Sequence, residues 1–137
     1  MKNVPQKPSV PAYLPYSLGV LWLWSGIQPL CCAAGESLAL LRRVGLPEGW
    51  LWPVFAGAAL LDVCFGLLCF GYGGLGRAWR ARLWLAQLAA VAGYSLIVAL
   101  RLPEMWAHPF APLVKNVPVL AVLWMLIKEE KGQAAAE

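Results

Sequence analysis

The sequence predicts an all-α membrane protein, an antiparallel bundle of four transmembrane helices with both termini in the cytoplasm. Hydrophobic residues make up 61% of the 137 residues and charged residues 13%, against about 45–50% and about 25% in soluble domains. Four charge-poor runs are each close to the roughly 17–25 residues that a helix needs to cross a bilayer. Because these runs lack the alternating polarity of membrane β-strands, helices are expected.

The first run is Tyr13–Ala34. Residues 1–14 are rich in proline and lysine and predict an extended cytoplasmic lead before the membrane domain of residues 15–127. Pro15 falls in the first turn, where a missing N–H costs little. A cleavable signal peptide is the alternative, but the apolar stretch is long for one and Pro29 lies just upstream of the candidate cleavage site.

The segment after the first run, ESLALLRRVGLPEG, places Leu38, Leu41 and Val44 at helical spacing beside two arginines. This pattern is typical of an amphipathic helix that lies on a membrane surface. The glycine and proline that follow it, Gly45 and Pro47, are expected to end it. A short helix on the outer surface is therefore predicted between the first two spans.

The second run, Leu51–Gly71, is interrupted only by Asp62, and the third, Leu83–Leu100, carries no charge. The glycine-rich and then basic segment between them, GYGGLGRAWRAR, predicts a tight cytoplasmic turn. Small residues on the first two runs predict that their helices approach closely. These residues are Gly19, Gly26, Ala33, Gly57 and Gly66.

The fourth run, Phe110–Ile127, begins within the segment HPFAPLVKN, which is expected to face outward. Pro109 and Pro112 are expected to start the helix, and Pro118 removes one backbone hydrogen bond and predicts a kink. Residues 128–137 would then form a C-terminal cytoplasmic tail.

Positive charge predicts the orientation. Seven basic residues lie in the lead, the second loop and the tail, and four lie on the other side of the membrane. The seven are Lys2, Lys7, Arg77, Arg80, Arg82, Lys128 and Lys131, and the four are Arg42, Arg43, Arg101 and Lys115. The positive-inside rule then predicts a multi-pass protein of the cell (inner) membrane with both termini inside. No basic patch is interleaved with aromatic residues, so the lipid bilayer is an expected partner and nucleic acid is not.

Tryptophan is frequent, with eight residues. Five fall at predicted membrane interfaces, where an amphipathic ring is favoured. These are Trp50, Trp52, Trp79, Trp84 and Trp106. Trp22 and Trp24 lie inside the first run on different helix faces, so one of them is expected to line the interior of the bundle.

Asp62 is the sharpest candidate for function. It lies eleven residues into the second run, about 17 Å along a helix that rises about 1.5 Å per residue, which is near the membrane midplane. A charged carboxylate there costs about 2.5–3.5 kcal/mol on insertion scales. One interpretation is a proton-responsive or ligand-binding carboxylate. The other is a protonated or hydrogen-bonded aspartate that joins two helices, and the sequence leaves both open.

Four further residues are candidates for the same site. Lys115 is the nearest counter-charge to Asp62, unless it extends outward to the lipid headgroups, and Glu36 is a second candidate partner. Asn116 can hydrogen-bond a neighbouring helix. His108 has an unperturbed pKa near neutrality, but a single histidine is too little for a zinc site, and a role as a loop residue at the interface is the alternative.

The four cysteines form no C-x-x-C motif, since Cys31 and Cys32 are adjacent and Cys64 and Cys69 are five apart. They are interpreted as small apolar helix residues, with an outside redox partner for Cys31 or Cys32 as the alternative. No serine–histidine–carboxylate set or nucleotide motif is present. The sequence therefore predicts no catalytic residue, no metal site and no activity of the chain on its own.

Three motifs, LWLWSGI, ALLDVCFGLL and LPEMWAHPFAPLVKNVPVLAVL, resemble the DoxX-like family of small membrane proteins. The likeness extends from Leu18 to Ile127, and its last motif is the most specific. The resemblance implies a four-helix membrane bundle. The family takes its name from a subunit of an archaeal thiosulfate:quinone oxidoreductase, and some members are associated with NAD-binding reductase or epimerase-like domains.

Three functions remain as hypotheses. The first is an accessory or small-ligand-binding subunit linked to redox metabolism, with a quinone or a lipid as ligand, a redox enzyme as partner subunit and a homo-oligomer as assembly. The second is a small proton-coupled transporter, although the four-span multidrug exporters carry their carboxylate in the first span. The third is a structural membrane anchor or assembly factor without a ligand.

Overall fold

The computed structural model describes residues 10–108 and 113–135. Within these residues the chain forms five α-helices, two short 3-10 helices and no strand, which confirms the all-α prediction. The elements in chain order are α1 (Tyr13–Cys32), α2 (Ala34–Val44), α3 (Glu48–Phe70), η1 (Tyr72–Gly74), α4 (Arg77–Arg101), η2 (Pro103–Trp106) and α5 (Asn116–Ala134).

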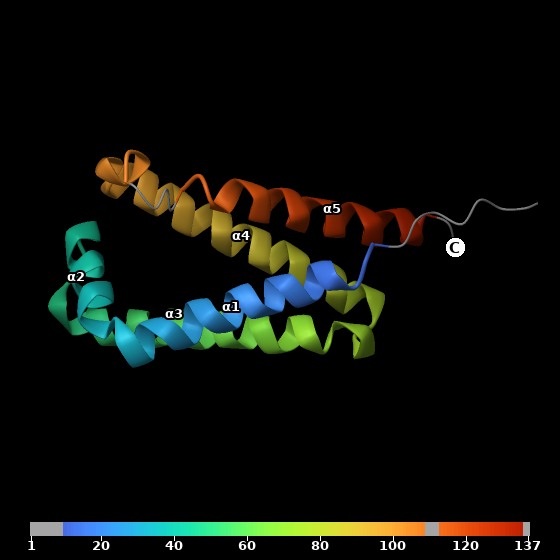
Figure 1. The fold of residues 1–137 in the computed structure, drawn as a ribbon, viewed down its shortest axis with the longest axis horizontal. Helices are drawn as coiled ribbons and strands as arrows, with labels where there is room; N and C mark the ends of the chain where they lie inside the picture. The colour runs from blue at the N-terminus through green and yellow to red at the C-terminus, as the bar shows by residue number, and fades with distance from the viewer. Residues whose placement is uncertain (1–9, 109–112, 136–137) are drawn as a thin grey trace, which may run out of the picture.

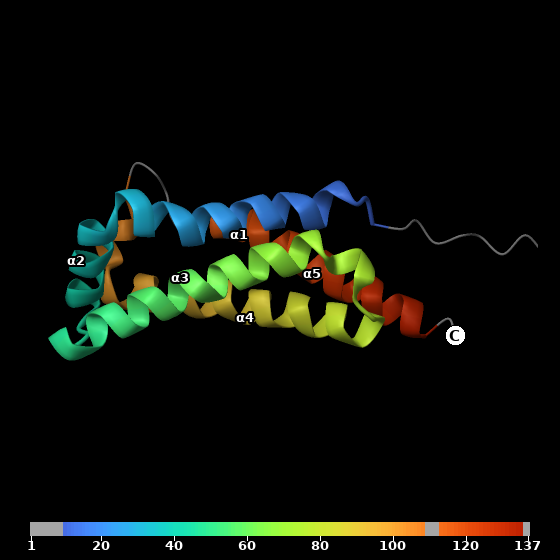
Figure 2. The same cartoon turned by 90° about the horizontal axis from the view of Figure 1, so that it is seen from below.

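The four long helices α1, α3, α4 and α5 lie along the long axis of the molecule and run in alternating directions (Figures 1 and 2). The starts of α1 and α4 and the ends of α3 and α5 meet at one end, which we call the Arg80 end. The short helix α2 crosses the other end, which we call the α2 end (Figure 1). α1 packs along α3, and α4 packs along α5.

Two helices in the described residues, α3 and α4, are long and apolar enough to cross a membrane. α1 and α2 meet the same criterion only as a pair that is bent by 102°, which raises the number to three at most. α5 differs because its last turns carry charged residues. They are Lys128, Glu129, Glu130 and Lys131.

Large apolar side chains are exposed along the outside of the long helices, where a soluble protein of this size would bury them. Examples from α1, α3, α4 and α5 are Val20, Trp24, Leu60, Leu67, Leu85, Leu96 and Trp124. Hydrocarbon can cover such a surface, so it supports a location in the membrane.

Glycines bring α1 and α3 close together. A Cβ at Gly26 would lie 2.7 Å from the carbonyl oxygen of Ala59, and one at Gly66 would lie 2.6 Å from Cγ of Leu23. Gly19 is similarly crowded by α3. The prediction for these three glycines is confirmed, whereas it was wrong for Gly57, where nothing lies within 4 Å of the added atom.

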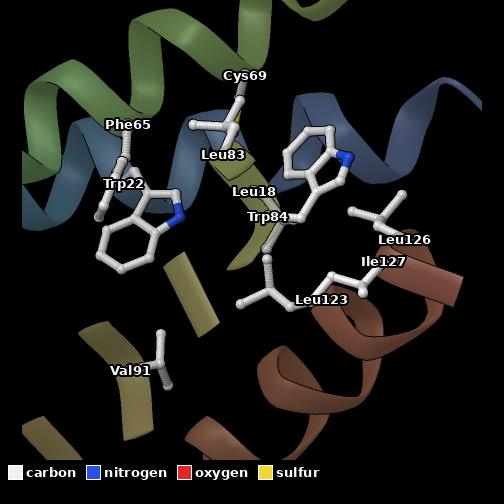
Figure 3. Close-up of a cluster of buried hydrophobic side chains, with 10 residues drawn as sticks. All are labelled: Leu18, Trp22, Phe65, Cys69, Leu83, Trp84, Val91, Leu123, Leu126 and Ile127. Carbon is white, nitrogen blue, oxygen red and sulfur yellow. The ribbon is translucent and has the colours of Figure 1, made fainter. Parts of the chain in front are cut away.

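The buried core lies towards the Arg80 end and receives side chains from all four long helices (Figure 3). Trp22 is 4% exposed and packs edge-on against Phe65, with 5.0 Å between the ring centroids, whereas Trp24 is exposed. One of the two tryptophans of the first run thus lines the interior, as predicted. Trp84 is 1% exposed and belongs to this core, so its ring packs inside the bundle and does not face lipid.

The predicted amphipathic helix is present as α2. It ends at Gly45, whose φ of 105° is the left-handed conformation that suits glycine at a helix end. Arg42 donates two hydrogen bonds to the Glu48 carboxylate, with 2.7 Å from Nε to Oε1, and the pKa of Arg42 is raised mainly by this contact. Arg43 pairs with Glu104 of η2. These exposed ion pairs connect α2 to the start of α3 and to the segment after α4.

The final helix differs from the prediction. α5 begins at Asn116, whereas residues 113–115 form a turn, so Lys115 and Asn116 lie at the start of the helix and not several residues into it. Pro118 is the third residue of α5. The first four N–H groups of a helix have no acceptor within the helix, so a proline at this position removes no helical hydrogen bond. The predicted kink at Pro118 was therefore wrong. The predictions for Pro109 and Pro112 lie outside the described residues.

Candidate functional site

Polar side chains from all four long helices converge on a cavity of about 150 Å³ inside the bundle. The polar lining residues are Ser25 of α1, Asp62 of α3, Tyr94 of α4 and Asn116 of α5. Leu21, Trp22, Val91 and Val119 form the apolar part of the wall. A mainly apolar pocket with a few convergent polar groups is the usual form of a small-molecule site.

Asp62 lies on the face of α3 that also carries Phe55 and Ala59, both buried against neighbouring helices. Its Oδ1 atom is buried and has no hydrogen-bond partner among the described residues. An unpaired buried acceptor costs about 1–3 kcal/mol. Asp62 therefore has one oxygen available for a further hydrogen-bonding group.

Asn116 is placed at the cavity by the start of α5. Its Nδ2 atom donates a hydrogen bond to Oγ of Ser95 on α4, at 2.8 Å. This contact confirms that Asn116 hydrogen-bonds a neighbouring helix. It holds the start of α5 against α4, one position along from Tyr94, and leaves the second N–H of the amide for another acceptor.

A second cavity of about 190 Å³ lies between α1, α2 and α3, and Ser25 and Asp62 line it as well. Its other walls are mainly apolar, with Pro29 of α1, Leu40 and Leu41 of α2 and Phe55 of α3 among them. The sharp bend between α1 and α2 carries α2 across the end of the long helices (Figure 1). Ser25 and Asp62 consequently line both cavities, the one among the four long helices and the one beside α2.

The other three predicted site residues lie elsewhere at the α2 end. Glu36 is exposed on α2, His108 follows η2 and Lys115 directly precedes α5. In the part of the chain that the structure describes, none of these three residues lines either of the two cavities. Of the five candidates, Asp62 and Asn116 thus share one cavity.

Sequence reasoning missed Gln87, which is fully buried on α4. Its Oε1 accepts a hydrogen bond from Nε1 of Trp22 at 2.7 Å, and its Nε2 donates to Sγ of Cys69 at 3.2 Å. The amide therefore joins α4 to α1 and α3. The signal was present, because Gln87 is the one glutamine in the third run. Ser25 and Tyr94 were missed as well, because serine and tyrosine are common in membrane helices.

All four cysteines are free thiols, and only Cys69 is buried. Cys31 and Cys32 are exposed at the bend between α1 and α2, and Cys64 is exposed on α3. No group of three or more histidine, cysteine, aspartate or glutamate side chains that could hold a metal ion occurs within residues 10–108 and 113–135.

Comparison with known proteins gives one family. The model of the DoxX-like family matches residues 19–124, which include most of α1, all of α2, α3 and α4, and the first half of α5. No curated protein and no solved structure matches the chain. The match covers both cavities, the Trp22–Gln87 hydrogen bond and the motifs in which the resemblance was seen. The chain is a membrane protein that belongs to the DoxX-like family.

Proposed function

We propose that the protein binds a small ligand in the cavity at Asp62. The ligand has carbonyl groups that accept hydrogen bonds, and the ring of a quinone is the best example. The observation that carries this proposal is the convergence of Ser25, Asp62, Tyr94 and Asn116 on one space inside an otherwise apolar bundle. Hydroxyl and amide groups can donate to a carbonyl oxygen, as can the carboxyl group of Asp62 in its protonated form, and the apolar walls suit the ring.

The size of the space supports a ligand that enters only in part. Pockets that enclose a drug-sized molecule measure about 300–1,000 Å³, whereas the interior cavity measures about 150 Å³. A single ring fits this description better than a whole cofactor. The isoprenoid tail of a quinone would lie along the exposed apolar side chains of the bundle, which face lipid.

The proposed topology has four spans, α1, α3, α4 and α5, and the Arg80 end faces the cytoplasm. The proposed location is the inner membrane of the cell. The alternating directions of these helices (Figures 1 and 2) and the basic residues at the Arg80 end support this topology. α5 has a short apolar part, and its flanking Lys128 and Lys131 would reach the headgroups from within the membrane.

The proposed role is accessory. The chain would hold the ligand, and a partner enzyme subunit would carry out the redox reaction. Glu36, His108 and Lys115 lie at the α2 end of the molecule. In this proposal they contribute to the rim through which the ligand approaches, or to contact with the partner.

Ligand retention tests the proposal. The full chain would be purified in mild detergent from cells that contain quinone, and the bound quinone extracted and quantified per chain. Tyr94→Phe should lower retention about fivefold, because it removes one hydrogen bond worth about 1 kcal/mol. Tyr13→Phe makes the same chemical change at an exposed residue far from the cavity and should retain quinone as the natural chain does.

Two results would count against quinone binding at this site. One is equal retention of quinone by Tyr94→Phe and Tyr13→Phe, and the other is the absence of quinone from the natural chain and from both variants. Absence of any small molecule in a folded, correctly inserted protein would favour the structural anchor or assembly factor.

Proton-coupled transport is a second candidate, because Asp62 lines both the interior cavity and the cavity beneath α2. A carboxylate with access to two spaces is the arrangement that a proton relay needs. Asp62→Asn separates the two functions. The amide keeps hydrogen-bonding capacity and should preserve ligand binding, whereas it cannot carry a proton and should abolish proton-coupled uptake in proteoliposomes.

A further inference from the structure

A third cavity lies at the opposite end of the bundle from α2 and is separate from the Asp62 site. It measures about 200 Å³. Its polar wall comes from η1 and from the facing ends of α4 and α5. The polar side chains are Tyr72, Arg80, Trp84, Glu129, Glu130 and Gln133. The proposed quinone site uses none of these residues.

The indole N–H of Trp84 is an unused donor at this cavity. Trp84 is 1% exposed, and its Nε1 atom is buried without a hydrogen-bond partner among the described residues. In Figure 3 this nitrogen lies on the side of the ring nearer Leu126, another residue of the cavity wall, and points away from Trp22. Because most buried polar groups are hydrogen-bonded, an indole donor in this position indicates a missing acceptor.

Arg80 supplies further donors in a fixed orientation. Its Nε and Nη2 atoms donate to the two oxygens of Glu130, at 2.8 and 3.2 Å, and Nη1 donates to the carbonyl oxygen of Leu75 at 3.2 Å. A guanidinium group has five N–H bonds, so these three contacts leave two. The side of the cavity with Arg80 and Trp84 is therefore suited to an oxyanion.

The opposite side is suited to a cation. Glu129 accepts one hydrogen bond from Nε2 of Gln133, at 3.2 Å, and like Glu130 it lines the cavity. One guanidinium faces two carboxylates, so a purely anionic ligand would meet unbalanced negative charge at Glu129. A ligand with both an oxyanion and an ammonium group satisfies Arg80, Trp84 and Glu129 together.

The position of the cavity favours a membrane lipid as the source of this ligand. It lies where the apolar helices become charged, at the start of α4 and the end of α5. On the outside of the same end, Trp79 is exposed and the Arg82 guanidinium lies over its ring, 5.1 Å from the centroid. Tryptophan and arginine are typical of the headgroup level of a bilayer.

We propose that this cavity binds the headgroup of a phospholipid that carries a phosphate and a primary ammonium group, as phosphatidylethanolamine does. The phosphate oxygens accept from Nε1 of Trp84 and from Arg80, and the ammonium group donates to Glu129. The acyl chains extend over the exposed apolar surface of α4 and α5.

Native mass spectrometry of the full chain tests this proposal. The protein would be reconstituted in nanodiscs with equal amounts of phosphatidylethanolamine, phosphatidylcholine and phosphatidylglycerol of the same acyl chains, then released with its retained lipids. Phosphatidylethanolamine should be enriched about tenfold over the other two. Phosphatidylcholine has no N–H for Glu129, and phosphatidylglycerol has no ammonium group.

Two pairs of variants locate the lipid. Glu129→Gln should reduce the enrichment about tenfold, and Trp84→Phe should reduce the total amount of phosphatidylethanolamine retained about tenfold, because all three lipids carry the phosphate that Trp84 binds. The matched controls are Trp79→Phe, an exposed tryptophan at the same end, and Glu104→Gln, a carboxylate at the α2 end, and both should preserve the enrichment and the amount retained. Glu129 is only half-buried, so Glu129→Gln remains informative if Trp84→Phe does not fold.

Three results would overturn the proposal. They are equal retention of the three lipids, enrichment that survives Glu129→Gln in a folded protein, and tight binding of soluble glycerophosphoethanolamine without any lipid enrichment. The last result would assign the cavity to a soluble compound of the same chemistry in place of a lipid.

Discussion

Nε1 of Trp22 on α1 donates a hydrogen bond to Oε1 of Gln87 on α4, at 2.7 Å, across 65 residues of sequence. Gln87 also donates to Sγ of Cys69 on α3, so one buried amide connects three of the long helices. The contact lies beside the Asp62 cavity, whose wall includes Trp22. It holds the Trp22 ring, which belongs to the buried core (Figure 3) and also lines the cavity.

Gln87→Leu should lower the free energy of unfolding by about 1–3 kcal/mol, because Nε1 of Trp22 is then buried without an acceptor. Trp22→Phe in the same chain removes the unpaired donor. The double variant should therefore lose less than the sum of the two single variants, and unfolding in detergent measures all three. Strictly additive losses would contradict the coupling between these two residues.

Gly26→Ala should destabilise the protein by about 1–3 kcal/mol, because the new methyl group would lie 2.7 Å from a backbone carbonyl of α3. Gly57→Ala is the matched control. Nothing lies within 4 Å of its added methyl group, and alanine is the better helix former, so its melting temperature should stay equal or rise. Equal loss at both positions would show that α1 and α3 do not pack through Gly26.

Glu130→Gln should lower the free energy of unfolding by about 1.5–3 kcal/mol, the range for hydrogen bonds to charged groups. The Arg80 and Glu130 side chains are only 23% and 10% exposed, and two hydrogen bonds join them. Glu48→Gln breaks an ion pair of the same geometry whose side chains are 51% and 72% exposed, and it should change stability little. If Glu130→Gln and Glu48→Gln lowered the free energy of unfolding by similar amounts, burial would not explain the stability of the Arg80–Glu130 ion pair.

Labelling of intact cells with a membrane-impermeant maleimide tests the proposed orientation. Cys31 and Cys32 are exposed at the α2 end, which the proposal places outside, and Cys69 is buried. The natural chain should be labelled, and the variant Cys31→Ser/Cys32→Ser should not be, because the bilayer covers Cys64 on α3. If Cys31 and Cys32 were labelled only after the cells are broken, the α2 end would face the cytoplasm, which is the opposite of the proposed orientation.

The sequence predicted the helices best where composition alone decides. α1 and α3 match the first two apolar runs, and α4 extends the third run backwards through Arg77, Arg80 and Arg82. α5 was placed several residues too early, because Pro118 was interpreted as a kink inside a span. Proline is equally suited to the first turn of a helix, and the sequence does not distinguish these positions.

The site was predicted less well, because convergence of side chains depends on how helices pack. Asp62 and Asn116 were identified from their polarity inside apolar runs, and they share a cavity. Their neighbours Ser25 and Tyr94 are small or amphipathic residues that are common in membrane helices, so only the packing of α1 and α4 against α3 reveals them. Gln87 and Trp22 were likewise joined only by the fold.

Quinone binding at Asp62 is tested most directly by an equilibrium titration of the purified full chain with a short-chain quinone. Binding should be saturable, and Asp62→Leu and Tyr94→Phe should each weaken it about fivefold or more. Asp62→Asn should change the affinity little, and Tyr13→Phe should leave it unchanged. Binding of equal affinity in Asp62→Leu and the natural chain, or no saturable binding to the folded natural chain, would contradict quinone binding at Asp62.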